Sequence, residues 1–134
     1  MSNEKKKQYL RRYLVAKRCV ALLLEQIESL RENKMSPSGT LDGMPHGSGT
    51  SDLSGYAARL DELMRELEAE REMQMVTYRE IWNQVKKIPN ATEQEVLTRR
   101  YLIGQSWEKI AVEMHYSYRQ IIRIHGAALQ HFSW

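Results

Sequence analysis

Apolar side chains recur at alternating intervals of four and three through residues 4–34, a segment without glycine or proline. The series is Tyr9, Tyr13, Ala16, Val20, Leu23, Ile27 and Leu30. This spacing puts all of them on one side of a long helix, as in helices that pair with a partner. Four more leucines widen the stripe: Leu10, Leu14, Leu22 and Leu24. A wide stripe predicts a buried hairpin or bundle rather than a narrow two-stranded coil.

A second long helix is predicted over about residues 53–88. Its stripe is heptad-like and consists of Ala57, Leu60, Met64, Leu67, Tyr78, Ile81, Val85 and Ile88. Arg71 and Gln74 interrupt this stripe. We expect its first half to pair antiparallel with the first helix, while the second half, which carries Trp82, supports the segment that follows.

Residues 36–55 are predicted to be a loop or linker between the two long helices. They hold five of the seven glycines and two of the three prolines, with Ser, Thr and Asp between them. The glycines follow no predicted strand and precede no lysine, so a phosphate-cradling loop is disfavoured.

Helix-ending and helix-starting signals follow. Pro89 stops the second helix, and the segment from Thr92 to Glu95 matches a capping box that opens a helix over residues 93–103. Leu97 and Tyr101 share one face of that helix, and Gly104 is placed to end it. No strand signal is present in the sequence.

The last 30 residues predict two short helices joined by a tight turn. Ser106 caps the first, whose apolar face is Trp107, Ile110, Ala111 and Met114. The turn is residues 115–117, and a capping box from Ser117 to Gln120 opens the second helix. Ile121, Ala128 and Phe132 form its buried side, flanked by Ile124, His125 and Leu129. This arrangement is a helix-turn-helix.

The opposite side of the final helix carries Arg119, Gln120, Arg123, Ala127 and Gln130. Arginine pairs bidentately with guanine and glutamine with adenine in the major groove of DNA. Lys109 and the amides that begin its helix are suited to holding a phosphate. We therefore predict that the DNA-contacting residues are Trp107, Lys109, Ser117, Tyr118, Arg119, Gln120 and Arg123. The alternative is an ordinary three-helix core with a solvated polar face.

The charge distribution agrees with a polyanionic partner. The chain has 20 Lys and Arg against 17 Asp and Glu, and no acidic residue follows Glu113, although Arg119, Arg123 and three histidines do. A second basic group, from Lys5 to Lys7 with Arg11 and Arg12, is either a solvated helix start or another phosphate-contacting surface.

Residues 95–121 resemble region 4 of sigma factors. In that region a helix ending in RYL-x-G, here residues 100–104, leads to S-aromatic-E-x-IA, here residues 106–111, and then to the recognition helix. His115 stands at the turn, where such modules usually have glycine, and Gly126 stands within the recognition helix. The longer arrangement, with its linker at residues 43–49, resembles phage-encoded sigma-like regulators of the ArpU/RinA type.

The resemblance implies a regulator of phage or prophage transcription in a bacterial cytoplasm, whose recognition helix starts at Tyr118. It implies double-stranded DNA and host RNA polymerase as partners, and the exposed helical seams suit a homodimer. No recognisable domain for the −10 promoter element is present, so the chain is not expected to act alone as a sigma factor. A small-terminase-like DNA packaging protein and a protein-binding helical adaptor are the alternatives.

Other function classes are excluded by what the sequence lacks. Its 134 residues hold one compact domain or a small domain with a helical arm, and no apolar stretch is long enough to span a membrane. Cys19 is the only cysteine, the four histidines form no ligand pair, and no nucleophile motif is present. We expect neither an enzyme nor a cofactor or metal. The prediction is an all-α protein with a helical hairpin or coiled-coil-like arm over residues 1–88 and a helix-turn-helix module over 89–134.

Overall fold

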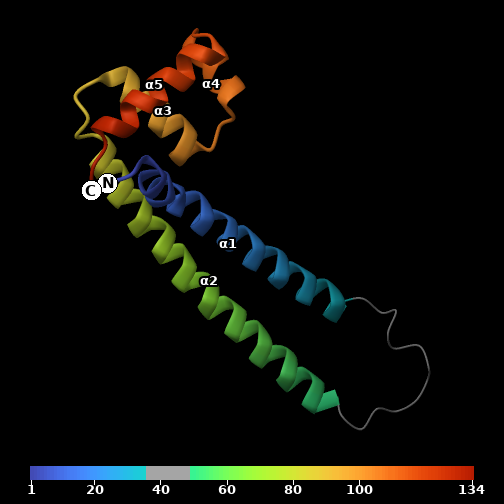
Figure 1. Cartoon of the computed structure of the whole chain (residues 1–134). Coiled ribbons are helices and arrows are strands. Elements are labelled where there is room, and N and C mark those ends of the chain that lie inside the picture. The colour runs from blue at the N-terminus through green and yellow to red at the C-terminus, as the bar shows by residue number, and fades with distance from the viewer. Residues whose placement is uncertain (36–48) are drawn as a thin grey trace. The chain divides into compact units, whose positions relative to one another are not determined.

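The computed structural model describes residues 1–35 and 49–134, and these are helices joined by turns, without a β-strand (Figure 1). This confirms the all-α prediction. The elements are α1 (Asn3–Met35), α2 (Gly49–Val85), α3 (Ala91–Leu97), the π-helix η2 (Thr98–Ile103), α4 (Trp107–Met114) and α5 (Tyr118–His131). Within the described ranges, none of these helices is apolar over the length that a bilayer requires.

The predicted linker is too long at its C-terminal end. Because α2 begins at Gly49, residues 49–55 are helical rather than part of a loop. The rest of the predicted linker, residues 36–48, lies outside the described residues, as do most of the glycines of the disfavoured phosphate-cradling loop.

The chain divides into two compact units. Unit 1 comprises Met1–Lys17 and Met73–Trp134, and unit 2 comprises Arg18–Glu72. Each long helix therefore contributes one part to each unit. The predicted boundary between residues 88 and 89 falls inside unit 1, because the first turns of α1 and the last turns of α2 belong with the C-terminal helices.

In unit 2, α1 and α2 pack through one apolar core. The core side chains are Val20, Leu23, Ile27, Leu63 and Leu67, with Leu30 and Leu60 packed at its margin. The predicted seam of α1 is thereby confirmed. The predicted widening is wrong here, since Leu22 and Leu24 are 50% and 42% exposed.

The predicted register of α2 is wrong in part. Ala57, Met64 and Tyr78 are exposed, whereas Leu63 and Thr77 are buried. The true seam follows positions 60, 63, 67, 70, 74, 77 and 81, which again alternate by three and four. Glu70, Gln74 and Thr77 lie in it, so apolar spacing alone favours the neighbouring stripe. The helix also ends at Val85, three residues before the buried Ile88.

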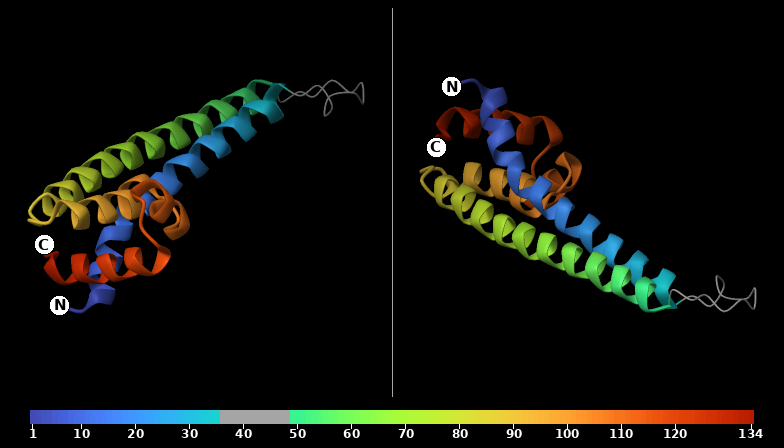
Figure 2. Two further views of the ribbon diagram at one scale, coloured as in Figure 1. Left: turned by 90° about the horizontal axis from the view of Figure 1, so that it is seen from above. Right: turned by 90° about the horizontal axis from the view of Figure 1, so that it is seen from below.

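Unit 1 has a core to which α1, α2, α3, η2 and α5 all contribute. Its buried members are Leu10, Ile81, Val85, Ile88, Leu97, Tyr101, Leu102, Ala128, Leu129 and Phe132. Both views in Figure 2 show the first turns of α1 lying beside the C-terminal half of α5. There, Tyr9 stacks on Trp134 with ring centroids 4.4 Å apart. The start of the chain therefore helps to hold its last helix.

The cap of α3 differs from the predicted one. Asn90, not Thr92, is the N-cap, and its Oδ1 accepts a hydrogen bond from the Glu93 amide at 3.1 Å. Asparagine is at least as good an N-cap as threonine, and capping by Asn90 starts the helix at Ala91, two residues earlier than predicted. Thr92 and Glu95 thus lie within the helix and form no capping box.

The predicted helix over residues 93–103 consists of two parts. After Leu97 the backbone widens into the π-helix η2, a rare form of helix that is frequent at functional sites. Gly104 ends it in the left-handed conformation, with a φ of 89°, as the sequence predicts. A Cβ atom at Gly104 would lie 3.3 Å from Leu14 Cδ2, so α1 passes close to this turn.

Candidate nucleic-acid interface

Helices α4 and α5 form the predicted helix-turn-helix. Ser106 Oγ accepts a hydrogen bond from the Lys109 amide at 3.2 Å, which confirms the predicted cap of α4. The turn begins at His115, which adopts left-handed dihedral angles, φ 60° and ψ 39°. A side chain at this position costs conformational energy that glycine would not.

The capping box at the start of α5 is also confirmed. The Gln120 amide donates to Ser117 Oγ at 3.1 Å, and the Ser117 amide donates to Gln120 Oε1 at 2.9 Å. The Gln120 side-chain oxygen is therefore engaged by the backbone. Bidentate pairing with adenine requires this oxygen to leave Ser117, whereas the Gln120 NH₂ group is free to donate without any rearrangement.

One side of α5 is fixed in a core shared with α3 and α4. Val96, Ile110, Ala111 and Ile121 make up this core, with Trp107, Met114 and Ile124 packed against it. On the other side, Arg119, Gln120, Arg123 and Gln130 are exposed, and Ala127 is half-buried. The face that the sequence predicts to point outward does so. Lys109, Ser117 and Tyr118 are exposed as well.

Trp107 differs from the other predicted contacts because it is half-buried. Its ring meets the His125 imidazole edge-on with centroids 4.5 Å apart, and the Arg100 guanidinium carbon lies 4.3 Å from its centroid. Trp107 therefore positions the start of α4 against η2 and α5. Sequence spacing alone did not identify Arg100 as part of this site, because Arg100 and Trp107 belong to different helices.

His125 is the buried polar group of α5. Its Nε2 lies 2.8 Å from the Tyr101 hydroxyl, so the buried imidazole is hydrogen-bonded. Burial, together with the smaller effect of the positive charges of Lys7, Arg100 and Arg11, lowers the pKa of His125 to about 4. Burial likewise raises the pKa of Tyr101 above its usual value. Both rings are therefore uncharged at neutral pH.

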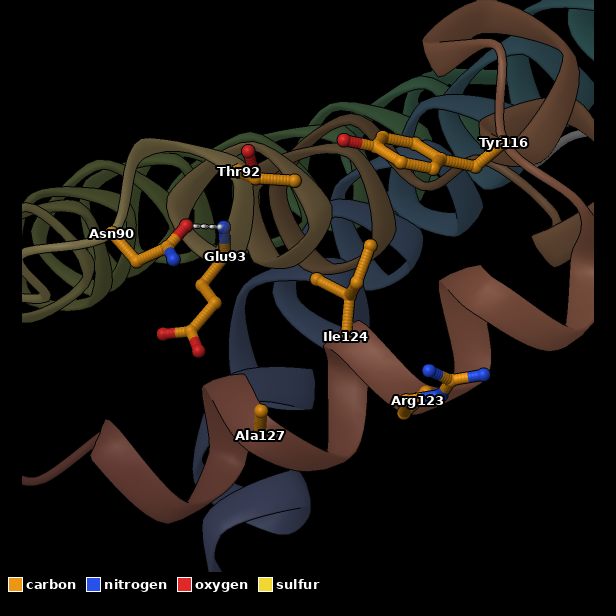
Figure 3. A pocket seen from close by; sticks show the side chains of 7 residues that line it. All are labelled: Asn90, Thr92, Glu93, Tyr116, Arg123, Ile124 and Ala127. Carbon is orange, nitrogen blue, oxygen red and sulfur yellow. Dashed lines mark hydrogen bonds between the residues drawn. The ribbon is translucent and has the colours of Figure 1, made fainter.

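A groove of about 300 Å³ runs between α3 and α5 on the outward side (Figure 3). Its lining consists of Asn90, Thr92, Glu93, Tyr116, Arg123, Ile124 and Ala127. The buried Glu93 carboxylate lies 2.9 Å from His131 Nδ1, so an acid beside the basic face is held by a partner on α5 itself. Arg123 remains open to a ligand from solvent.

The acidic groups of the C-terminal module lie on α3 and α4, and none lies on α5. Glu108 and Glu113 are exposed on α4, on either side of the buried Ile110 and Ala111. Over the described residues, no three His, Cys, Asp or Glu side chains gather in a set that could hold a metal ion. The chemistry that the exposed face of α5 offers is hydrogen-bond donation from arginine and amide groups.

We compared the sequence with models of protein families and with curated proteins, and the structure with solved structures, and none of these comparisons gives a match.

Proposed function

We propose that this protein is a sequence-specific DNA-binding regulator of transcription that inserts α5 into the major groove. The observation that carries the proposal is the exposed, acid-free face of α5, where Arg119 and Arg123 lie one turn apart. Arginines at this spacing share a helix face and can reach neighbouring base pairs. The buried face of the same helix is fixed by α3 and α4, so the arginines are held on a rigid support.

The resemblance of residues 95–121 to sigma factor region 4 supports the same proposal and makes it more specific. From the resemblance of the longer arrangement to phage-encoded sigma-like regulators, we infer that the target genes belong to a phage or prophage and that the protein acts in the cytoplasm of a bacterial host. Host RNA polymerase is the second partner that the resemblance implies. A homodimer would place two modules on paired half-sites.

The test is selection of bound fragments from the genome that encodes the protein, followed by fluorescence anisotropy with the selected duplex. Arg119→Ala and Arg123→Ala are each expected to weaken binding by about 1 to 3 kcal/mol, which is about 5-fold to 150-fold. The effect should be greater for the selected duplex than for a random one. Arg65→Ala and Arg71→Ala, exposed arginines of unit 2, are the matched controls.

Binding that is unaffected by both α5 substitutions would overturn the proposal, as would the absence of binding to any duplex. The assembly state separates regulation from DNA packaging. Light scattering is expected to report a dimer, whereas a ring of many subunits would contradict the regulatory proposal and favour a packaging protein. Circular dichroism of each variant checks that its helices are intact.

A further inference from the structure

A basic face of α1 lies against the turn between η2 and α4. Lys7, Arg11 and Leu14 occupy positions i, i+4 and i+7 of the helix and therefore share one side of it. Leu14 lies against Gly104, as its 3.3 Å approach to the position of a Cβ atom shows. Lys7 and Arg11 thus lie one turn apart on the side of α1 that contacts Gly104 through Leu14.

A third cation, Arg100, borders the same turn. Arg100 Nη1 donates to the carbonyl oxygen of Gln105 at 3.1 Å, and its guanidinium lies over the Trp107 ring. Gln105 follows Gly104, so Arg100 and Leu14 approach adjacent residues. Lys7, Arg11 and Arg100 all act on the buried His125 imidazole of α5, where each lowers its pKa. The three charges therefore surround one region of unit 1.

Little negative charge compensates this cluster. Glu4 Oε2 lies 4.0 Å from Lys7 Nζ, and Glu4 Oε1 lies 3.6 Å from an Arg11 guanidinium nitrogen. The Glu4 side chain is 65% exposed, and an ion pair this open to water contributes little. Lys7 and Arg11 keep 32% and 52% of their side-chain surface accessible. Like charges gathered in this way favour an anionic partner.

We propose that Lys7, Arg11 and Arg100 form a phosphate-binding surface that holds the DNA backbone beside the groove entered by α5. The proposal rests on the proposed DNA-binding function. Duplex DNA is the polyanion it commits to because Arg100 contacts Gln105 and Trp107 at the start of α4, the helix that packs against α5 in unit 1. Phosphate contacts of this kind orient a protein on the duplex without reading its sequence.

The test is the salt dependence of binding by the full chain, with a random 30-base-pair duplex as the probe. The slope of the logarithm of the binding constant against the logarithm of the salt concentration should become less steep by about 0.9 for each phosphate that the protein no longer neutralises. The double substitution Lys7→Gln with Arg11→Gln should therefore reduce the steepness of this slope by about 1.8. Lys7→Arg with Arg11→Lys keeps both charges and should keep the slope. Arg31→Gln with Arg71→Gln removes the same charge from exposed positions of unit 2 and is the matched control.

Three results would overturn the proposal. In the first, the control pair reduces the slope as much as Lys7→Gln with Arg11→Gln does, so that only net charge matters. In the second, the slope is unchanged in the Lys7 and Arg11 variant, although Arg119→Ala and Arg123→Ala still weaken binding; the proposed function then stands without this surface. In the third, the wild-type chain binds no duplex at low salt, and the proposed function fails as well.

A measurement without DNA checks the placement of the two charges. In the variant with Lys7→Gln and Arg11→Gln, the pKa of His125 followed by NMR should rise towards the ordinary histidine value, because two nearby positive charges are gone. A pKa equal to that of the wild-type chain would place Lys7 and Arg11 away from α5 and would contradict the surface.

Discussion

The ammonium nitrogen of Lys6 lies 2.6 Å from the carbonyl oxygen of Leu129 and 3.4 Å from that of Gln130. Carbonyl groups in the last turn of a helix lack partners within the helix and carry the negative end of its dipole. Lys6, 9% exposed, satisfies those of α5 from the other end of the sequence. The helix that carries Arg119 and Arg123 is thus fixed at its start by Ser117 and at its end by α1.

Lys6→Met is expected to lower the free energy of unfolding by about 1 to 3 kcal/mol. Methionine fills much of the space of the lysine stem but cannot donate to the Leu129 carbonyl, so the decrease reports the charged hydrogen bond. Urea unfolding followed by circular dichroism measures it. Lys5→Met, at the exposed neighbouring position, is the control and should change stability by no more than about 0.5 kcal/mol. Equal effects of the two substitutions would contradict the role of Lys6.

The stability of the protein should fall as the pH drops from about 6.5 to about 4 because of His125. Its pKa is lowered to about 4 in the folded chain from 6.5 in the unfolded chain, so in this window the unfolded state binds the extra proton. Stability is fully present above pH 6.5, and the decrease attributable to this residue approaches about 3 kcal/mol at pH 4. Urea unfolding at a series of pH values measures it.

His125→Gln isolates this contribution. Glutamine can still hydrogen-bond to the Tyr101 hydroxyl but does not titrate, so the variant should show a smaller decrease in stability between pH 6.5 and 4. All other side chains are the same in the two proteins, so their effect cancels in the comparison. Parallel curves for the two proteins would show that His125 is protonated equally in the folded and unfolded chains.

Local signals in the sequence predicted the C-terminal helices well. The capping residues Ser106 and Ser117 and the terminator Gly104 act on backbone groups within a few residues, so their effect is readable without the fold. The outward placement of Arg119 and Arg123 followed from the same local geometry, since α5 has a clear apolar side. The sequence did not single out Asn90, because Thr92 offers a similar cap two residues later.

Long-range features were not predictable in this way. Thr77 is buried in the seam of α2 and Lys6 under the end of α5, although neither is apolar. Whether such a side chain is buried depends on the segment that packs against it, which spacing within one helix does not reveal. The same reason explains Arg100, which lies within the π-helix η2 and contacts the Trp107 ring across the turn at Gly104.

The corrected register of α2 predicts opposite outcomes for two residues that are three positions apart. Leu67→Ala should destabilise unit 2 by about 2 to 5 kcal/mol, because Leu67 is 3% exposed and its removal leaves a cavity beside Val20, Leu23 and Ile27. Met64→Ala, at a 43% exposed position, should cost no more than about 0.5 kcal/mol. Limited proteolysis and urea unfolding measure both. A greater loss of stability in Met64→Ala than in Leu67→Ala would support the register predicted from apolar spacing instead.

His115→Gly is expected to stabilise the protein by about 0.5 to 1 kcal/mol. The left-handed backbone of His115 is strained for a residue with a Cβ atom, and relief of this strain exceeds the entropy that glycine gains in the unfolded chain. The midpoint of thermal unfolding should rise by about 2 °C. His115→Ala removes the imidazole but keeps the Cβ atom, so it should give no such increase. Equal increases for both variants would assign the strain to the imidazole instead.

Substitutions of Gly126 are expected to affect both the stability of α5 and the binding of DNA. Gly126 lies on the same stripe of α5 as Arg119 and Arg123, at i+7 from the first, and a Cβ atom there would meet nothing within 4 Å. Gly126→Ala should therefore stabilise the helix by about 1 kcal/mol.

Gly126→Leu should also fold, because the space beside the helix is open, but its bulk would stand between α5 and a DNA groove. We expect anisotropy to show at least about tenfold weaker binding for the leucine variant than for the alanine variant, equivalent to about 1.4 kcal/mol. Val76→Ala and Val76→Leu, at an exposed position of α2, serve as the control for removed and added bulk. Equal affinity of the two Gly126 variants would mean that DNA does not approach this side of α5, and the proposed recognition face would have to be abandoned.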